Sequence, residues 1–422
     1  MALRSQMKRR QLLLGITAMA VGGALSACRP DASDALEISV LAGSVPAEVL
    51  KTFRQQAAAP VKFQALNQLS GLFQQLQQWQ LAKKPRFSLR QLLFWVRDPL
   101  QIRPDNLVSL DDYWLSSAIA QDLIEPLTLE PDILNKLPAN WLQNWQQLIN
   151  QRVENLTRVE NLTVEEPEAT PTSVLREDAL WAAPYRVQPL VIVYRQSKMP
   201  ASSGADPFSQ WRNLLDPIWR NRIAMPDHPR IVLGLLQKIR SGSFNLTIES
   251  SLDRDNAPTA ADIEQQLDNQ LGDLLAQLDR QVKTYNGDNS LKALINGDVD
   301  VAISWAADIV SAQRRYQDLR MAIPSEGSLL STDVWVKPKG AEMTKAARDW
   351  ISYCWDRGPA AQISRSGRGL SPIFIDQETA LPDTLVNSSL PLESIQNSEP
   401  LLPLSAEAQA AYFEFWQRAR TS

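Results

Sequence analysis

Few residues of this 422-residue chain could carry out metal or nucleophile chemistry. The sequence has a single histidine, His228, and two cysteines, Cys28 and Cys354. One histidine cannot form an HExxH zinc site, and two distant cysteines provide neither a structural zinc site nor a CxxC redox pair. A Ser-His-Asp triad would depend on His228, which lies in the turn-rich segment 225–229. We interpret His228 as a loop residue, and we expect no enzyme activity, cofactor or metal.

A tryptophan and an aspartate follow a predicted strand in the second half of the chain. The segment 298–304 alternates in polarity, which predicts a strand after a short helix over 288–295 that Gly297 ends. The apolar face of this strand is formed by Val299, Val301 and Ile303. Trp305 and Asp308 come just after its carboxyl end, where ligands gather in open α/β sheets. Alternatively, Trp305 packs in the core and Asp308 caps the next helix.

Alternating elements at the start of the folded region indicate the class of fold. A strand over 36–41 and a helix over 46–53 precede a second strand at 61–63 and a Gln-rich amphipathic helix over 69–79. This order is typical of an α/β layer fold. Further on, the six residues 152–157 recur in tandem as 158–163. Two copies are too few for a solenoid, so we interpret them as a surface loop.

Residues 1–27 are typical of a bacterial export signal. Four basic residues precede an apolar run over 12–24, which at about 13 residues is too short to span a bilayer. Leu25-Ser26-Ala27-Cys28 resembles a lipobox, which implies cleavage before Cys28 and a lipid such as palmitate on that residue. Residues 28–35 would form the tether of a periplasmic protein anchored to the membrane. Arg9-Arg10 also resembles a twin-arginine signal, so twin-arginine and general secretory export both stay open.

Composition and charge narrow the class of ligand. The chain is 44% hydrophobic and 21% charged, as in ordinary globular proteins. Without residues 1–27 it has 39 Lys+Arg against 47 Asp+Glu, a net charge of −8, because that segment holds four of the 43 basic residues and no acidic ones. This surplus argues against nucleic-acid binding and tolerates a cationic ligand. Cys354, among aromatic neighbours, is expected to be a buried, inert thiol.

Five segments in order resemble the spermidine/putrescine-binding family of bacterial transport systems. They comprise a Pro-Tyr element, a Trp-x-x-Leu-x-Asp-Pro-like element, a helix start, a Gly-Asp-Val signature that ends in an aspartate, and a Pro-x-Glu-Gly element that leads to an aspartate. In this sequence they are Ala183-Pro184-Tyr185, Trp211–Pro217, Met225–Arg230, Ile295–Asp308 and Ile323–Asp333.

The resemblance implies an α/β fold of the two-lobed periplasmic-binding-protein type (type II), with lobes joined by crossing hinge strands. Lobe 1 would comprise residues 36–188 plus 333–375, and lobe 2 residues 189–332 plus 376–422. Such a protein is the solute-binding lipoprotein of an ABC importer. It closes on a polyamine such as putrescine or spermidine, or on a related small polar solute, and ABC permease subunits read the closed state. We expect a monomer.

The same resemblance assigns the ligand site. Asp308 and Asp333 match positions that grip a cation, and Trp305 matches an aromatic wall. Glu326 matches a glutamate of the family pattern. Alternatively, Glu326 is a turn carboxylate and Asp333 caps a hinge strand. Tyr185, of the Pro-Tyr element, is a further candidate, and Arg186 beside it is a candidate that the family pattern does not supply.

Departures from the family pattern put polyamine specificity in question. Arg186-Val187-Gln188 stands where the family usually has a Trp, Ser331 replaces an aromatic, and Val40–Ser44 lacks an aromatic and acidic cluster. Arg186 could instead hold an anionic or zwitterionic solute. A scaffold or assembly protein that captures a protein partner is the other alternative, because fold does not determine function.

Overall fold

The computed structural model describes most of the chain from residue 35 onward. The described ranges are 35–83, 103–162, 179–200, 207–245, 258–286, 290–367, 369–375, 395, 397–402 and 404–421. Residues 35–422 form one unit by their contacts. Within the described ranges, no helix combines the length and apolar character needed to span a bilayer. Cys28 and the predicted signal peptide lie outside the described residues.

The described strands form one mixed sheet with the order β2-β1-β3-β10-β5-β8-β6-β7. Their bounds are β1 Leu36–Leu41, β2 Val61–Leu66, β3 Leu107–Asp111, β5 Ala183–Arg195, β6 Ile223–Met225, β7 Val282–Tyr285, β8 Val301–Trp305 and β10 Leu329–Pro338. Three more strands pair off this path: β4 (Ile124–Glu125) and β11 (Glu399–Pro400) with β10, and β9 (Leu319–Ala322) with β5. The predicted strands at 36–41 and 61–63 are confirmed.

The long strands β5 and β10 connect two halves of the sheet. The first part of β5 pairs with β10, and its last part pairs with β8 and β9. The apolar cores divide at the same place, since one pair of clusters surrounds β1, β3 and most of β10 and another pair surrounds β6 and β8. The lobe boundaries expected from the sequence remain a prediction.

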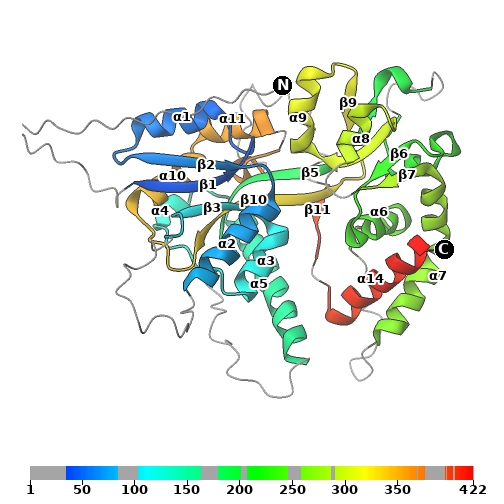
Figure 1. The fold of residues 1–422 in the computed structure, drawn as a ribbon, viewed down its shortest axis with the longest axis horizontal. Coiled ribbons are helices and arrows are strands. Elements are labelled where there is room, and N and C mark those ends of the chain that lie inside the picture. Colours follow the sequence, from blue (N-terminus) through cyan, green and yellow to red (C-terminus); the bar gives the residue numbers. More distant parts are fainter. Residues whose placement is uncertain are drawn as a thin grey trace, which may run out of the picture. The chain divides into compact units, whose positions relative to one another are not determined.

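Helices cover both faces of the first half (Figure 1). On one face lie α1 (Ala47–Gln56), α10 (Lys345–Cys354) and α11 (Arg357–Gly367), and on the other α2 (Leu69–Lys83), α3 (Asp112–Ala120) and α5 (Ala139–Leu162). The short α4 spans Pro131–Leu134. The helices expected over 46–53 and 69–79 are therefore confirmed, each extending a few residues further.

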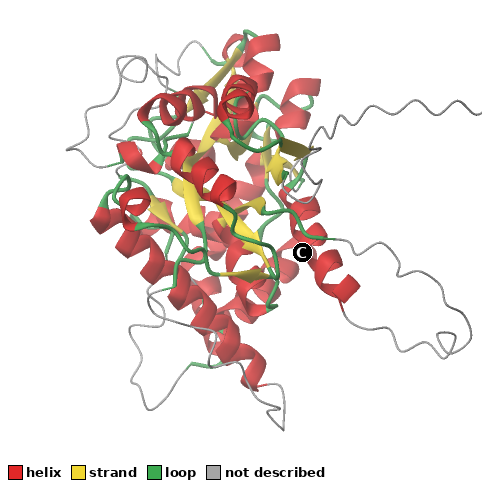
Figure 2. Ribbon diagram, turned by 90° about the vertical axis from the view of Figure 1, so that its left-hand side faces the viewer, coloured by secondary structure: helices red, strands yellow, loops and turns green. Residues whose placement is uncertain are grey.

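The second half has the same layered build. Figure 2, in which the first half faces the viewer, shows helices on both sides of the strands. One apolar face is covered by α6 (Pro229–Ser241), α7 (Ala260–Gln281) and the C-terminal α14 (Ala406–Thr421), the other by α8 (Ser290–Asn296) and α9 (Ala306–Arg315). Short 3-10 helices are η2 Gln196–Lys198, η4 Trp211–Leu215, η5 Pro217–Trp219 and η8 Pro372–Phe374.

Two local expectations need correction. The tandem copies do not form a loop over residues 152–162, because α5 continues through Leu162. Trp145, Ile149 and Val153 are buried at four-residue spacing, a helical period that runs into the first copy. The strand predicted at 298–304 begins only at Val301. The left-handed stop at Gly297 is confirmed, with φ +82°.

Cys354 is confirmed as a buried thiol. It is the last residue of α10, its side chain is fully buried, and burial raises the pKa of the thiol well above its ordinary value. The thiolate is the reactive form, so the folded protein should protect this cysteine. In a Cys28→Ser variant, Cys354 is the sole remaining cysteine. We expect a maleimide to label that variant only in denaturant, and labelling of the native protein would contradict the packing of α10.

Candidate functional site

The carboxyl ends of two pairs of parallel strands position the candidate site. β1 and β3 are parallel neighbours, and so are β6 and β8. In open α/β sheets the loops at such ends carry the ligand-binding side chains. The segment after β3 begins with Asp112 and Tyr113, and β8 ends at Trp305 shortly before Asp308. The connecting strands β5 and β10 add Arg186 and Asp333.

Trp305 and Asp308 have both structural contacts and exposed surface. Trp305 is half-buried and packs against the apolar cluster under β8. Asp308 lies exposed in the first turn of α9, where the helix N-terminus stabilises a carboxylate. Ser304 Oγ donates to Asp308 Oδ2 at 3.3 Å. The alternative interpretation of these residues thus has a physical basis, but the exposed carboxylate can also meet a solute.

Asp333 and Arg186 form an ion pair in the interior. Arg186 Nε donates to Asp333 Oδ2 at 2.6 Å, and Nη2 contacts the same oxygen. The two side chains are 1% and 0% exposed. Burial raises the pKa of the Asp333 carboxyl, and the charge and hydrogen bond of Arg186 oppose that rise. The guanidinium therefore lies against the carboxylate to which the sequence assigned a solute cation.

The pair lies at the edge of a β-bulge. Asp333 lies opposite Arg186, but the ladder resumes at Pro184 and skips Tyr185. An extra residue in one strand redirects the side chains beside it, and a proline, which has no N–H, is tolerated at such an irregularity. On its other side Asp333 lies opposite Asp111, the last residue of β3. The pair thus sits where three strands meet.

Tyr185 supports the site from within the core. Its side chain is fully buried and stacks on Trp335 with ring centroids 4.5 Å apart. Its hydroxyl lies 2.8 Å from Ser109 Oγ and donates to Ser44 Oγ at 3.0 Å. Burial raises the pKa of this phenol, which stays protonated. Tyr185 therefore ties β3 and the turn after β1 to β5.

Glu326 closes the turn before β10. Its Oε1 accepts a hydrogen bond of 2.6 Å from the backbone N–H of Trp211, at the start of η4. Trp211 Nε1 in turn donates to the Gly327 carbonyl at 2.9 Å. These contacts fit the turn-carboxylate alternative. Glu326 therefore forms its hydrogen bond with η4, whereas Arg186 and Asp333 are bonded to each other.

Sequence reasoning missed Asp112. This carboxylate is 4% exposed, and its Oδ1 accepts from Thr332 N at 3.0 Å and from Ser331 Oγ at 3.3 Å. Ser331, where an aromatic was missing, thus contacts a carboxylate. The signal was present, because Asp112 directly follows the mostly apolar segment 107–111.

Tyr113 and His228 were also missed as a pair. Tyr113 is 57% exposed, and its ring lies 5.4 Å from the His228 ring in an edge-on contact. His228 is the N-cap residue of α6, three residues after the end of β6, so the contact joins the two halves near their strand ends. Nearby on β5, Gln188 Oε1 accepts from Ala307 N at the start of α9, at 3.3 Å.

The charges around the pair are predominantly negative. Besides Asp333, the negative charge of Asp308 raises the pKa of Arg186. The negative charge of Asp112 raises the pKa of Asp333. Asp333, Asp308 and Asp112 together with Arg186 have a formal charge of −2. Among the described residues, no group of three or more potential ligands is placed to hold a metal ion. The arrangement is suited to an organic cation, whose methylene groups could pack on Trp305.

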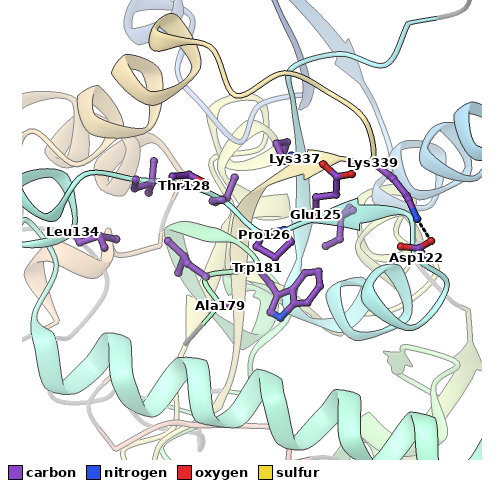
Figure 3. A pocket seen from close by; sticks show the side chains of 13 residues that line it. Asp122, Glu125, Pro126, Thr128, Leu134, Ala179, Trp181, Lys337 and Lys339 are labelled. Atoms are coloured by element: carbon purple, nitrogen blue, oxygen red, sulfur yellow. Dashed lines mark hydrogen bonds and ion pairs between the residues drawn. The ribbon is translucent and has the colours of Figure 1, made fainter. Parts of the chain in front are cut away.

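A pocket of about 690 Å³ lies elsewhere, beside the paired ends of β4 and β10, and is lined also by residues 126–129 and 179–181 (Figure 3). Its walls include Leu127 and Trp181, and its charged groups include Lys339, which pairs with Asp122. None of the site residues predicted from the sequence lines this pocket.

Two curated proteins match part of the chain. Spermidine/putrescine-binding periplasmic protein 1 of Haemophilus influenzae is 25% identical over 175 residues, 42% of this chain and 44% of that protein. The putrescine-binding periplasmic protein PotF of Escherichia coli is 26% identical over 199 residues, 44% of this chain and 50% of that protein. The matched region thus spans about half the length of these relatives.

Solved structures match the fold over more of the chain. The spermidine/putrescine ABC transporter substrate-binding protein PotD of Streptococcus pneumoniae has a TM-score of 0.63 at 17% identity, covering 92% of this chain and 99% of that one. The TpPotD lipoprotein of Treponema pallidum has a TM-score of 0.59 at 14% identity, covering 92% and 100%. These likenesses confirm the predicted α/β, periplasmic-binding-protein fold class.

A family model decides the classification. The model described as "Bacterial extracellular solute-binding protein" matches residues 104–390, about two thirds of the chain. It agrees with the resemblance found in the sequence, and members of such a family bind solutes rather than convert them. The chain therefore belongs to the bacterial extracellular solute-binding protein family.

Proposed function

We propose that this protein is the solute-binding component of an ABC importer and that its solute is a small organic amine of the putrescine or spermidine kind. The observation that carries the proposal is the surplus of carboxylates around the connecting strands, with Asp308 exposed. An ammonium group loses hydration when it is enclosed, and a carboxylate offsets that loss. The polyamine-binding relatives support the same class of solute.

The contacts of Arg186 argue against the anionic alternative. Its Nε and Nη2 both face Asp333, and its side chain is 1% exposed. A carboxylate solute would have to compete with Asp333 and would also be repelled by Asp308 and Asp112. An amine meets neither obstacle.

The cellular context forms part of the same proposal. Export and lipidation at Cys28 would anchor the protein to the membrane on the periplasmic side, where we expect a monomer. Closure around the solute would then allow the ABC permease subunits to bind the closed, loaded protein. β5 and β10, which connect the two halves of the sheet, would act as the hinge.

A change at Asp308 tests the solute class. We expect Asp308→Asn to weaken putrescine binding by about 10–100-fold, because one charge-assisted contact is lost. Isothermal titration calorimetry on the full chain measures this directly. Asp273→Asn on α7, another exposed carboxylate, serves as the charge-matched control and should bind like the parent. Equal affinities for all three proteins would remove Asp308 from the site. If the unsubstituted protein binds no small solute but binds a protein partner, the scaffold alternative is favoured.

A further inference from the structure

The ion pair between Arg186 and Asp333 is one-sided. Both guanidinium contacts go to Asp333 Oδ2. Asp333 Oδ1 and Arg186 Nη1 are buried and have no hydrogen-bond partner among the described residues. A purely structural pair at this depth is favourable only when its remaining atoms are also satisfied. The carboxylate therefore has an unused acceptor beside the guanidinium.

The backbone holds Arg186 in place. Val187 N donates to the Leu370 carbonyl at 2.8 Å, and Leu370 N donates back at 2.7 Å. At Gly369 a Cβ would lie 2.6 Å from the Val187 carbonyl oxygen and 2.8 Å from Arg186 Cγ. Only the missing side chain at Gly369 lets the arginine stem run so close to that segment. Because its stem is enclosed, the guanidinium cannot easily move aside for an incoming cation.

The position of the pair relates it to the solute site. Asp112 Oδ1 accepts a hydrogen bond of 3.0 Å from Thr332 N, the residue before Asp333, and the charge of exposed Asp308 favours the charged form of Arg186. Asp333 is thus one of the three carboxylates, and it is the one that is paired with a cationic side chain of the protein, Arg186. Without Arg186 the same surroundings would have a formal charge of −3 instead of −2.

We infer that Arg186 is a specificity-determining residue that fills the Asp333 subsite as a built-in cation and so lowers by one the number of ammonium groups the site accepts. The inference rests on the proposed function, because it concerns which amine binds. A diamine matches the two remaining carboxylates. A triamine brings a further ammonium that finds Asp333 already paired and Arg186 repelling it.

The test compares two amines on matched variants of the full chain. Calorimetry should give the parent a higher affinity for putrescine than for spermidine. Arg186→Gln keeps a hydrogen-bond donor but removes the charge, and it should raise the spermidine-to-putrescine affinity ratio at least about tenfold. Arg186→Lys retains the charge and should keep the ratio of the parent. An unchanged ratio in Arg186→Gln, with putrescine still bound, would overturn the inference.

Two further measurements keep the test decisive. If Arg186→Gln is too unstable for calorimetry, its thermal unfolding should shift upward more with spermidine than with putrescine, and equal shifts would contradict the inference. Asp333→Asn leaves Arg186 uncompensated, so it should weaken binding of both amines, and unchanged affinities would also contradict it. If the parent binds neither amine, the proposed function itself fails. Binding with the wrong preference overturns only the role of Arg186.

Discussion

Replacing Arg186 with methionine is expected to lower the free energy of unfolding by about 3–5 kcal/mol. The variant leaves the fully buried Asp333 without its cation, and loss of one partner of a buried pair costs far more than the pair contributes net. Denaturant unfolding followed by tryptophan fluorescence measures the change. A loss below about 1 kcal/mol, the size expected of an exposed ion pair, would mean that the pair is not buried.

The same variant should acquire a pH dependence of known sign. Burial already raises the pKa of Asp333 in the folded state, and without Arg186 less opposes that rise. A group whose folded pKa exceeds its unfolded value stabilises the protein below the unfolded pKa, and this contribution is lost as pH rises through the folded pKa. Arg186→Met should therefore be less stable at pH 8 than at pH 5, by up to about 1.4 kcal/mol per pH unit relative to the parent.

A double variant provides the control for this prediction. Arg186→Met combined with Asp333→Leu removes both charges and fills the space with apolar atoms. Such replacements of buried pairs are often neutral or stabilising, so most of the lost stability should return. A double variant as unstable as Arg186→Met would indicate that lost packing, not an unpaired carboxylate, causes the defect.

Gly327→Ala is the second change with a large expected effect, a loss of about 3–5 kcal/mol in the free energy of unfolding. Gly327 has φ +87°, and a Cβ there would lie 2.0 Å from the carbonyl oxygen of Asn397. The returning C-terminal segment would have to move. That movement would break the bond of 2.9 Å from Glu399 N to the Ser328 carbonyl, together with the bonds that the Glu399 side chain accepts, among them one from Phe244 N at 2.9 Å.

Gly297 supplies a matched control for this substitution. It has φ +82°, but a Cβ there would meet no atom within 4 Å. Gly297→Ala should therefore show only the cost of the left-handed backbone, about 1–2 kcal/mol. Equal losses at the two glycines, measured by denaturant unfolding, would show that contact with Asn397 is unimportant.

Local elements could be predicted from the sequence because their signals are local. The strand at 36–41, the amphipathic helix from Leu69 and the stop at Gly297 each follow from periodicity or from a residue with special backbone freedom. The error at 152–163 has a local cause too. The duplication suggests a loop, whereas the four-residue spacing of apolar residues that enters it from α5 indicates a helix.

The site was harder because its contacts depend on strand register. Arg186 and Asp333 are 147 residues apart, and the register between β5 and β10 places them opposite each other. Both residues were expected in the site, but not as partners. Tyr113 and His228 meet through the ends of different strands, which no local pattern indicates. Asp112 was readable as an acid after a strand, whereas its bonds to Ser331 and Thr332 depend on the path of β10.

The measurement that tests the central claim most directly compares three solutes with the same methylene spacer and different ends. Calorimetry on the full chain would use putrescine, the dicarboxylate adipate and neutral 1,4-butanediol. The surplus of negative charge around Asp308, Asp112 and the Arg186–Asp333 pair predicts that putrescine binds and that adipate and butanediol do not. Binding of adipate in preference to putrescine would contradict the proposal that this protein binds a small organic amine.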